Sequence, residues 1–297
     1  MSIARAALSD SRPEEAEKTY LLLETLQRMV KNPGGKFGTI LLTLIVIACV
    51  LAQWIAPFSP IAMDLGSMFA TPSQVHWLGT DGLGRDILSR LLYGGRYSLA
   101  LGLSASLFGS LVSVVIGSVA GYFGGKTEAL IMRAMDVWSA LPGMLICILI
   151  SSVLGTGFFN TVLALSIGNV PGGVRMIRGQ ILAERSKEYI EAARSISCSH
   201  SSIMFRHLLP NVIQPMIVSA TMGIGMTITM AAALSYIGLG VRPPTPEWGA
   251  MLADARAHIL TYPHLITFPG ITIALTVLSI NLMGDGLRDA LDPKLRR

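Results

Sequence analysis

Charged side chains are scarce in this 297-residue chain. Asp, Glu, Lys and Arg together make up 14% of it, whereas an ordinary soluble domain carries about 25%. Hydrophobic residues account for 52%, and the mean hydropathy is +0.58. The chain has too few polar groups to cover a water-soluble globule, so the composition excludes an ordinary soluble domain.

The sequence also lacks the residue sets that support catalysis, metal binding or disulfide bonding. Its three cysteines, Cys49, Cys147 and Cys198, lie far apart and match neither a disulfide framework nor a metal-ligand spacing. No Ser/His/Asp set, paired carboxylates or HExxH motif occurs, and no histidine has a second ligand at metal-binding spacing. We therefore predict no catalytic residues, no metal and no cofactor.

One segment comes close to a nucleotide-binding loop. Residues 120–127 match the pattern G-x-x-x-x-G-K-[ST] except that Ala120 replaces the first glycine. A phosphate-binding loop of this kind follows a β-strand and opens a helix, but this segment follows a long apolar stretch. We expect no ATP site here, so any ATP-driven function needs a partner subunit.

Apolar residues occur in blocks long enough to cross a bilayer, which takes about 20 residues. We predict an all-α membrane protein with six transmembrane helices. The fourth is the weakest because Pro171-Gly172-Gly173 interrupts it, and similar Pro-Gly pairs lie at 142–143 and 269–270. The six blocks are 37–56, 98–122, 129–154, 158–174, 212–239 and 265–283.

The distribution of Lys and Arg predicts the topology, because cytoplasmic loops carry an excess of both. Residues 1–36 carry six, residues 183–210 carry four and the last thirteen residues carry four, against three in 57–97 and two in 241–264. Both termini and the 183–210 insert are therefore expected in the cytoplasm. Six spans that start inside also end inside, so the count and the charges agree.

Small residues mark one face of the second block. Gly109, Ser113, Gly117 and Gly121 recur at four-residue intervals, a spacing that lets helix backbones approach closely in lipid. We expect this face to pack against other helices of the protein.

The 183–210 insert is the most informative stretch, because it is polar and lies between two apolar blocks. We expect two short helices, with Ser186 capping the first and Ser199 capping a second that ends near Pro210. On the first helix, Tyr189, Ala193 and Ile196 share one face. A helix–turn–helix could bind DNA, but the flanking membrane spans argue against nucleic acid.

The insert also carries a known motif. Glu191-Ala192-Ala193 followed at fixed spacing by Leu209-Pro210 resembles the EAA loop of ABC-importer permeases, with Ser197 where the family has glycine and His207 where it has an apolar residue. Three further stretches resemble the dipeptide/oligopeptide/nickel permease family, and within it the second, C-type subunit. They are residues 76–98, 243–249 and 284–293.

This resemblance implies a type I ABC importer permease fold whose coupling helices lie in the cytoplasm. It assigns ATPase coupling to Glu191, Ala192, Ala193, Ser197, Leu209 and Pro210, with the first insert helix docked in a groove of the ATPase. Small Ala192 and Ala193 would allow close approach. A Ser in place of Gly at 197 permits the turn less freely if φ is positive.

The implied function is a non-catalytic permease subunit that forms half of the path for di- or oligopeptides in a bacterial inner membrane. The implied partners are a second homologous permease subunit, two cytoplasmic ATP-binding subunits, an extracytoplasmic substrate-binding protein and membrane lipid. The expected divisions are a cytoplasmic segment (1–36) with an amphipathic helix over 14–30, the first span with an outer loop (37–97), the permease core (98–287) and a cytoplasmic tail (288–297).

Three alternatives stay open. The same machinery could import nickel or a metal chelate. An ion-coupled secondary transporter would need ionisable groups at mid-membrane depth, and a membrane-embedded enzyme would need a polar catalytic set within the spans. The sequence shows neither feature, which disfavours both of these classes.

Overall fold

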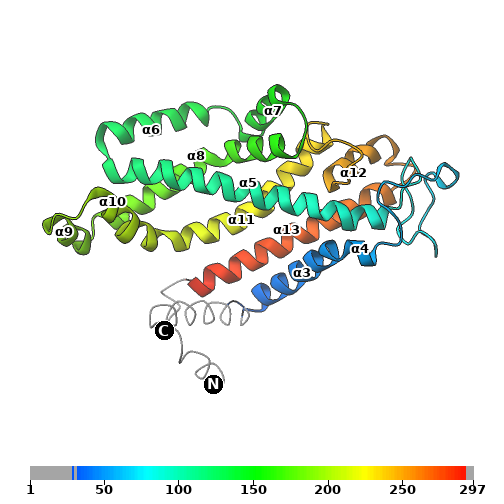
Figure 1. Ribbon diagram of the computed structural model, residues 1–297, viewed down its shortest axis with the longest axis horizontal. Coiled ribbons are helices and arrows are strands. Elements are labelled where there is room, and N and C mark those ends of the chain that lie inside the picture. Colours follow the sequence, from blue (N-terminus) through cyan, green and yellow to red (C-terminus); the bar gives the residue numbers. More distant parts are fainter. Residues whose placement is uncertain (1–28, 30–31, 292–297) are drawn as a thin grey trace, which may run out of the picture.

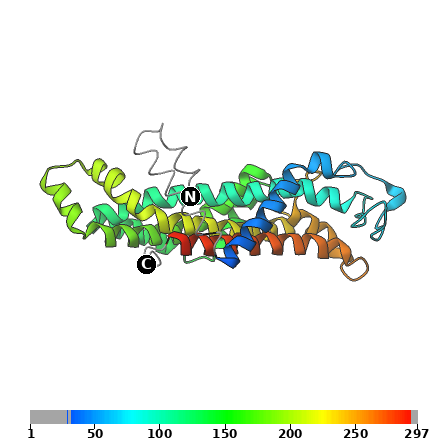
Figure 2. The same cartoon turned by 90° about the horizontal axis from the view of Figure 1, so that it is seen from below.

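The computed structural model describes residue 29 and residues 32–291. This part of the chain is helical and contains no β-strand, only an isolated bridge between Thr80 and Asp86. The long helices run side by side as an elongated bundle (Figures 1 and 2). The amphipathic helix predicted at 14–30 and the tail beyond residue 291 lie outside the described residues, apart from Met29.

The helices follow one another with short connections, except for the long segment between α4 and α5. Their bounds are α3 Pro33–Val50, α4 Ala52–Ile55, η1 Leu65–Ser67, α5 Ile87–Phe123, α6 Gly125–Trp138, α7 Gly143–Leu154, α8 Phe158–Arg185, α9 Glu188–Ser195, α10 His200–Ser202, η2 Ile203–Leu208, α11 Leu209–Tyr236, α12 Trp248–Ala255, η3 Arg256–His258 and α13 His264–Leu291.

The prediction of six spans is only partly met. Among the described residues, four helices are long and apolar enough to cross a membrane: α3, α5, α13 and the α10–α11 run from His200 to Tyr236. The third predicted span is broken, because α6 and α7 meet at 80° around the Pro142-Gly143 pair. Counting that bent pair as one span gives five. The fourth predicted span corresponds to α8, which has length but carries Arg175, Arg178 and Arg185.

Helix α8 is unbroken although Pro171 lies inside it, so the fourth predicted span is continuous through Pro171-Gly172-Gly173. A proline removes one helical hydrogen bond and clashes with the preceding turn, which neighbouring helices can compensate. Pro171 is buried against the neighbouring helices, and the hydroxyl of Ser113 on α5 donates to the carbonyl of Val170 at 3.2 Å. The Pro269-Gly270 pair likewise lies inside a continuous helix, α13.

The small residues of α5 pack against α8, as predicted. A Cβ built on Gly117 would lie 2.9 Å from the carbonyl oxygen of Val174, and one on Gly121 would lie 2.8 Å from Cβ of Ile181. Both distances are too short for a real side chain, so only glycine lets the two backbones come this close. Helix α3 lies along α13 in a similar way, with Gly35 against Gly286.

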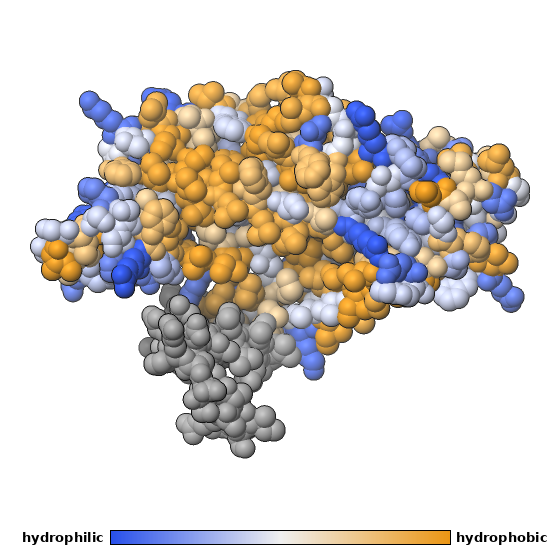
Figure 3. All heavy atoms as spheres, viewed as in Figure 1, coloured by the Kyte–Doolittle hydropathy of each residue, from blue (hydrophilic) through white to orange (hydrophobic). Residues whose placement is uncertain are grey.

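The bundle has two different ends. One end is formed by α9 and α10, and the other by α12 and the segment between α4 and α5 (Figure 1). Apolar side chains cover most of the middle of the face shown in Figure 3, and hydrophilic ones gather toward both ends. We refer to these as the α9 end and the α12 end.

Helix α5 begins at Ile87, well before the predicted start at Ser98. The reason is a cap: the Asp86 carboxylate accepts hydrogen bonds from the backbone N–H and the hydroxyl of Ser89, both at 2.8 Å. Aspartate at this position satisfies donors that the first helical turn leaves free. The polar first turns of α5 therefore belong to the folded α12 end.

Candidate functional site

The predicted insert folds as a helical hairpin at the α9 end. Helix α9 begins after Lys187, and Ser186 instead closes α8 by donating its hydroxyl to the carbonyl of Ala183 at 3.0 Å. The prediction of Ser186 as the N-cap of this helix is therefore wrong. Ser199 does cap the second helix, since its oxygen accepts from the N–H of Ser202 at 3.3 Å.

The second arm of the hairpin does not end near Pro210. It continues from α10 through a stretch of π-helix, η2, directly into α11, which begins at Leu209. Pro210 sits in the first turn of α11, directly after the π-helical stretch η2. The Leu-Pro pair therefore joins the hairpin to a long apolar helix without a break.

Ala193 lies inside the protein and not on its surface. Its side chain is 5% exposed and belongs to an apolar cluster with Ile190 of α9 and Ile203 and Leu208 of η2. Tyr122 of α5, two isoleucines of α8 and Val212 of α11 complete the cluster. The apolar face of α9 is therefore covered by the chain's own bundle, and the role of Ala193 in ATPase coupling stays a prediction.

The exposed side of the hairpin is different. Glu191 and Ala192 point to the outside of α9, Ile196 just beyond it is 76% exposed, and Phe205 on η2 is 65% exposed. These four residues, which we call the hairpin surface, are among the exposed hairpin residues that another protein can reach. The sequence analysis did not find this surface, because it depends on how α9 is rotated about its axis. Apolar periodicity alone assigned Ile196 to the same face as Ala193.

Ser197 forms the turn between the two arms. Its φ is +58°, in the left-handed region that favours glycine. Two backbone hydrogen bonds close the turn, from the N–H of Ser197 to Arg194 at 2.9 Å and from the N–H of Cys198 to Ala193 at 3.1 Å. The backbone therefore adopts the conformation that a glycine would take, with a serine in its place.

The hairpin is tied to the bundle by polar contacts. The phenol oxygen of Tyr122 lies 2.7 Å from Nδ1 of His200, and the guanidinium of Arg185 donates to the carbonyl of Tyr122 at 2.7 Å. The phenol of Tyr189 donates to Glu184 at 2.5 Å. Partial burial and this hydrogen bond raise the pKa of Tyr189 to about 12, so the phenol stays a donor at any physiological pH.

The near-match to a nucleotide-binding loop is a turn between two helices. Residues 120–123 are the last turn of α5, and Gly124 and Gly125, both with positive φ, redirect the chain into α6. No strand precedes this turn, so the geometry that cradles phosphates is not formed by these residues.

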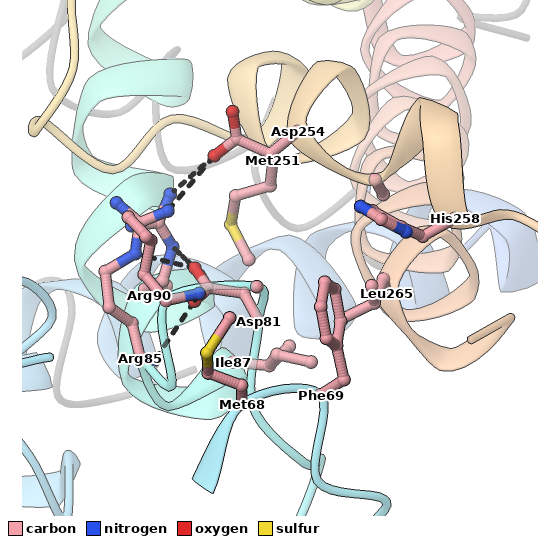
Figure 4. A pocket seen from close by; sticks show the side chains of 13 residues that line it. Met68, Phe69, Asp81, Arg85, Ile87, Arg90, Met251, Asp254, His258 and Leu265 are labelled. Atoms are coloured by element: carbon pink, nitrogen blue, oxygen red, sulfur yellow. Dashed lines mark hydrogen bonds and ion pairs between the residues drawn. The ribbon is translucent and has the colours of Figure 1, made fainter. Parts of the chain in front are cut away.

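The α12 end contains a pocket of about 420 Å³ with two unlike walls (Figure 4). Phe69, His258 and Leu265 form the apolar and aromatic wall. An ion-pair network forms the other, in which Asp81 pairs with Arg85 at 2.7 Å and Arg90 at 3.5 Å. Asp254 of α12 reaches the same two arginines at 3.2 and 3.5 Å.

Three members of this network lie in residues 76–98, one of the stretches that carried the family resemblance, and Asp254 ties them to α12. Arg90 is 2% exposed and Asp81 is 8% exposed, and an unpaired charge buried this deeply is strongly unfavourable. The sequence analysis did not find Asp254 as a partner, because the pairing spans residues far apart in the chain. Glu247 also has a structural role, since it caps α12 through the N–H groups of Gly249 and Ala250.

No group of three or more His, Cys, Asp or Glu in the described part of the chain could hold a metal ion. A strandless bundle of long apolar helices, with polar elements at its two ends, defines the class of multi-pass helical membrane proteins.

Comparisons with known proteins narrow this class. Residues 113–297 match the family described as "Binding-protein-dependent transport system inner membrane component", and residues 21–72 match "N-terminal TM domain of oligopeptide transport permease C". Glutathione transport system permease protein GsiD of Shigella flexneri is 46% identical over 92% of this chain and 90% of its own length. GsiD of Escherichia coli O6:K15:H31 is 45% identical over the same shares.

A solved structure shares the fold. An inward-facing form of the MetNI methionine ABC transporter superposes with a TM-score of 0.58 at 16% identity, covering 68% of this chain and 97% of that one. The chain belongs to the binding-protein-dependent transport system inner membrane component family. It is a C-type, non-catalytic permease subunit of an ABC importer, related to the peptide and nickel permeases, and it has the type I importer fold. Family membership implies ATPase and substrate-binding partners.

Proposed function

We propose that this subunit forms half of the membrane path of an importer for di- or oligopeptides. The observation that carries the proposal is the 46% identity to a glutathione permease over 92% of the chain, because glutathione is a tripeptide. The described residues hold no cluster of metal-binding side chains, which favours peptide over a bare nickel ion. The other half of the path belongs to a second, homologous permease subunit.

We also propose that the hairpin surface docks on a cytoplasmic ATPase subunit. Exposed Ile196 and Phe205 support this, because large apolar side chains are expensive to leave in water at a polar end of the molecule. Glu191 and Ala192 lie beside them. In this assignment Ala193, Ser197, Leu209 and Pro210 act indirectly, by holding the hairpin in shape.

The same assignment orients the protein. The α9 end faces the cytoplasm, in agreement with the four Lys and Arg residues of 183–210, and the α12 end faces the binding protein. Both termini are then cytoplasmic. The division into an outer loop that ends at residue 97 and a core of residues 98–287 is part of this proposal, with α5 beginning inside the loop at Ile87.

Reconstituted complexes test the proposal. Purified subunit, its permease partner, the two ATPases and the binding protein should together import labelled glutathione or another tripeptide in an ATP-dependent way. Import of Ni²⁺ without import of any di- or tripeptide would overturn the substrate assignment.

Ala192→Arg tests the docking surface in the same vesicles. It places a charge into the proposed contact, and since burying an unpaired charge costs more than about 1.4 kcal/mol, uptake should fall at least tenfold. Gln74→Arg adds the same charge at an exposed site of the α12 end and serves as the matched control. Normal uptake and normal co-purification of the ATPases with Ala192→Arg would refute docking here.

A further inference from the structure

A hollow of about 170 Å³ lies between α5, α8 and α11. Ser110, Asn169 and Ser219 contribute to its lining from near the middle of these three helices. It is separate from both the hairpin surface and the pocket of the α12 end. Its depth along the helices places it at the centre of the membrane-embedded part of the chain.

The lining is polar but uncharged. Hydroxyls, one amide and three thioethers surround the hollow, and none of its lining residues is Asp, Glu, Lys, Arg or His. The polar members are Ser106, Ser110, Ser113, Asn169, Ser219 and Thr227, and the thioethers belong to Met176, Met216 and Met226.

Part of this polar lining has unused hydrogen-bonding capacity. Ser106 donates to the carbonyl of Ala220 at 2.8 Å, and the amide nitrogen of Asn169 donates to Leu165 at 3.1 Å. Within the described residues, neither the carbonyl oxygen of Asn169 nor the hydroxyls of Ser110 and Ser219 have a hydrogen-bond partner in the structure. Such groups are costly against lipid, because hydrocarbon offers no donor or acceptor.

The hollow also differs from the surfaces where helices already pack. Between α5 and α8, glycines touch backbone directly, and the hydrogen of the Ser113 hydroxyl is shared between the carbonyls of Gly109 and Val170. A helix backbone placed in the hollow could accept from the hydroxyls, as Val170 does from Ser113, but it could not donate to the free oxygen of Asn169, since its own N–H groups are already paired. An extended chain could do both, because its amides are unpaired.

From this we propose that the hollow is a substrate subsite that binds the main chain of a peptide in transit. This proposal rests on the proposed peptide-import function. It adds which residues contact the peptide and which groups of the peptide they bind. Ser110, Asn169 and Ser219 exchange hydrogen bonds with backbone amides, which are common to all peptides. The flexible thioethers of the methionines accommodate side chains of different shape. Charge and metal coordination play no part in recognition.

Cysteine accessibility tests this subsite in the assembled transporter. Ser110→Cys and Ser219→Cys are introduced one at a time after Cys49, Cys147 and Cys198 have been replaced by serine. A small water-soluble methanethiosulfonate should label both positions, and excess trialanine should slow labelling severalfold. Val115→Cys, on the same helix and 65% exposed, faces lipid in this assignment and should stay unlabelled.

Each other result argues against the subsite. Labelling of the isolated subunit but not of the assembled transporter would show that helices of the second permease subunit fill the hollow. Labelling that trialanine does not slow would show water without peptide. Peptide uptake by the unmodified complex is measured in the same vesicles. If the unmodified complex takes up no peptide, the proposed peptide function is refuted. If it does take up peptide but trialanine does not slow labelling, only the subsite is refuted. Met226→Cys, 61% exposed, replaces either serine variant if that variant does not assemble.

Discussion

The phenol oxygen of Tyr122 and Nδ1 of His200 lie 2.7 Å apart, so the last turn of α5 is joined directly to the first residue of α10. The two rings also meet edge to face, with centroids 5.7 Å apart. Helix α5 runs the length of the bundle to the α12 end (Figure 1). Under the proposed docking, this contact is one of the points at which a movement of the hairpin reaches the membrane helices.

Tyr122→Phe should therefore weaken transport more than assembly. The hydrogen bond is worth about 1 kcal/mol, and its loss leaves the ring packing intact. We expect ATPase subunits to co-purify normally while peptide uptake per ATP hydrolysed decreases. His200→Ala should act through the same contact, so the double variant should be no worse than the more severe single one. Fully additive losses would show that the two residues act independently.

Ser197→Gly should be tolerated and should raise thermal stability. A side chain at a left-handed φ costs about 1–2 kcal/mol, partly offset by the greater freedom of glycine in the unfolded chain. Ser195→Gly, at the last residue of α9, is the control and should lower stability by about 0.5–1 kcal/mol. The two variants are compared by the midpoint temperature of their thermal aggregation in detergent. A lower midpoint for Ser197→Gly than for the parent contradicts the strain argument.

Asp81→Asn should be among the most damaging single changes at the α12 end. It removes the shared carboxylate of Arg85 and Arg90, and breaking a buried pair in this way costs about 3–5 kcal/mol. Asp136→Asn breaks an exposed pair with Arg175 at 3.1 Å and should cost only about 0–1 kcal/mol. Yield of monodisperse protein and its inactivation temperature measure both. Equal effects of the two changes would show that the buried network does not hold this end together.

Gly121→Ala should separate α5 from α8. The added Cβ would lie 2.8 Å from Cβ of Ile181 and 3.0 Å from the carbonyl of Arg178, and overpacking of this kind costs about 1–3 kcal/mol. Gly179→Ala is the matched change on α8, where no atom lies within 4 Å, and it should be neutral or slightly stabilising because alanine favours helix. The temperature of thermal inactivation of the assembled complex is measured for both variants. If the two variants inactivate at the same temperature, close backbone packing at Gly121 is disproved.

Cysteine labelling in intact cells tests the proposed orientation. In a background without the native cysteines, Ser201→Cys on the hairpin should be protected from an impermeant reagent, because Lys and Arg concentrate on the cytoplasmic side. Gln74→Cys, exposed at the α12 end, should react. Reaction at Ser201→Cys with protection at Gln74→Cys would reverse the assignment.

Much of this protein follows from local sequence alone. The apolar blocks predicted where long helices form, because a helix in lipid must satisfy its own backbone within one continuous segment. The small-residue spacing from Gly109 to Gly121 predicted close packing, and Ser199 predicted a helix start, because both patterns act within a few turns of chain. The spacing of the EAA motif likewise located the hairpin, and with it the family.

Other features depend on contacts between distant segments, which one sequence does not contain. Whether Ala193 faces a partner or the bundle depends on how α9 rests on α5 and η2, and that rotation turned its small face inward and left Ile196 outside. Asp254 joins Asp81, Arg85 and Arg90 only because α12 folds back onto the start of α5. Pro171 does not interrupt α8, because α5 packs against it there, whereas the chain does bend at Pro142.

These features share one physical reason. Packing against a neighbouring element contributes a few kcal/mol, which exceeds the differences in helix propensity that a local sequence pattern encodes.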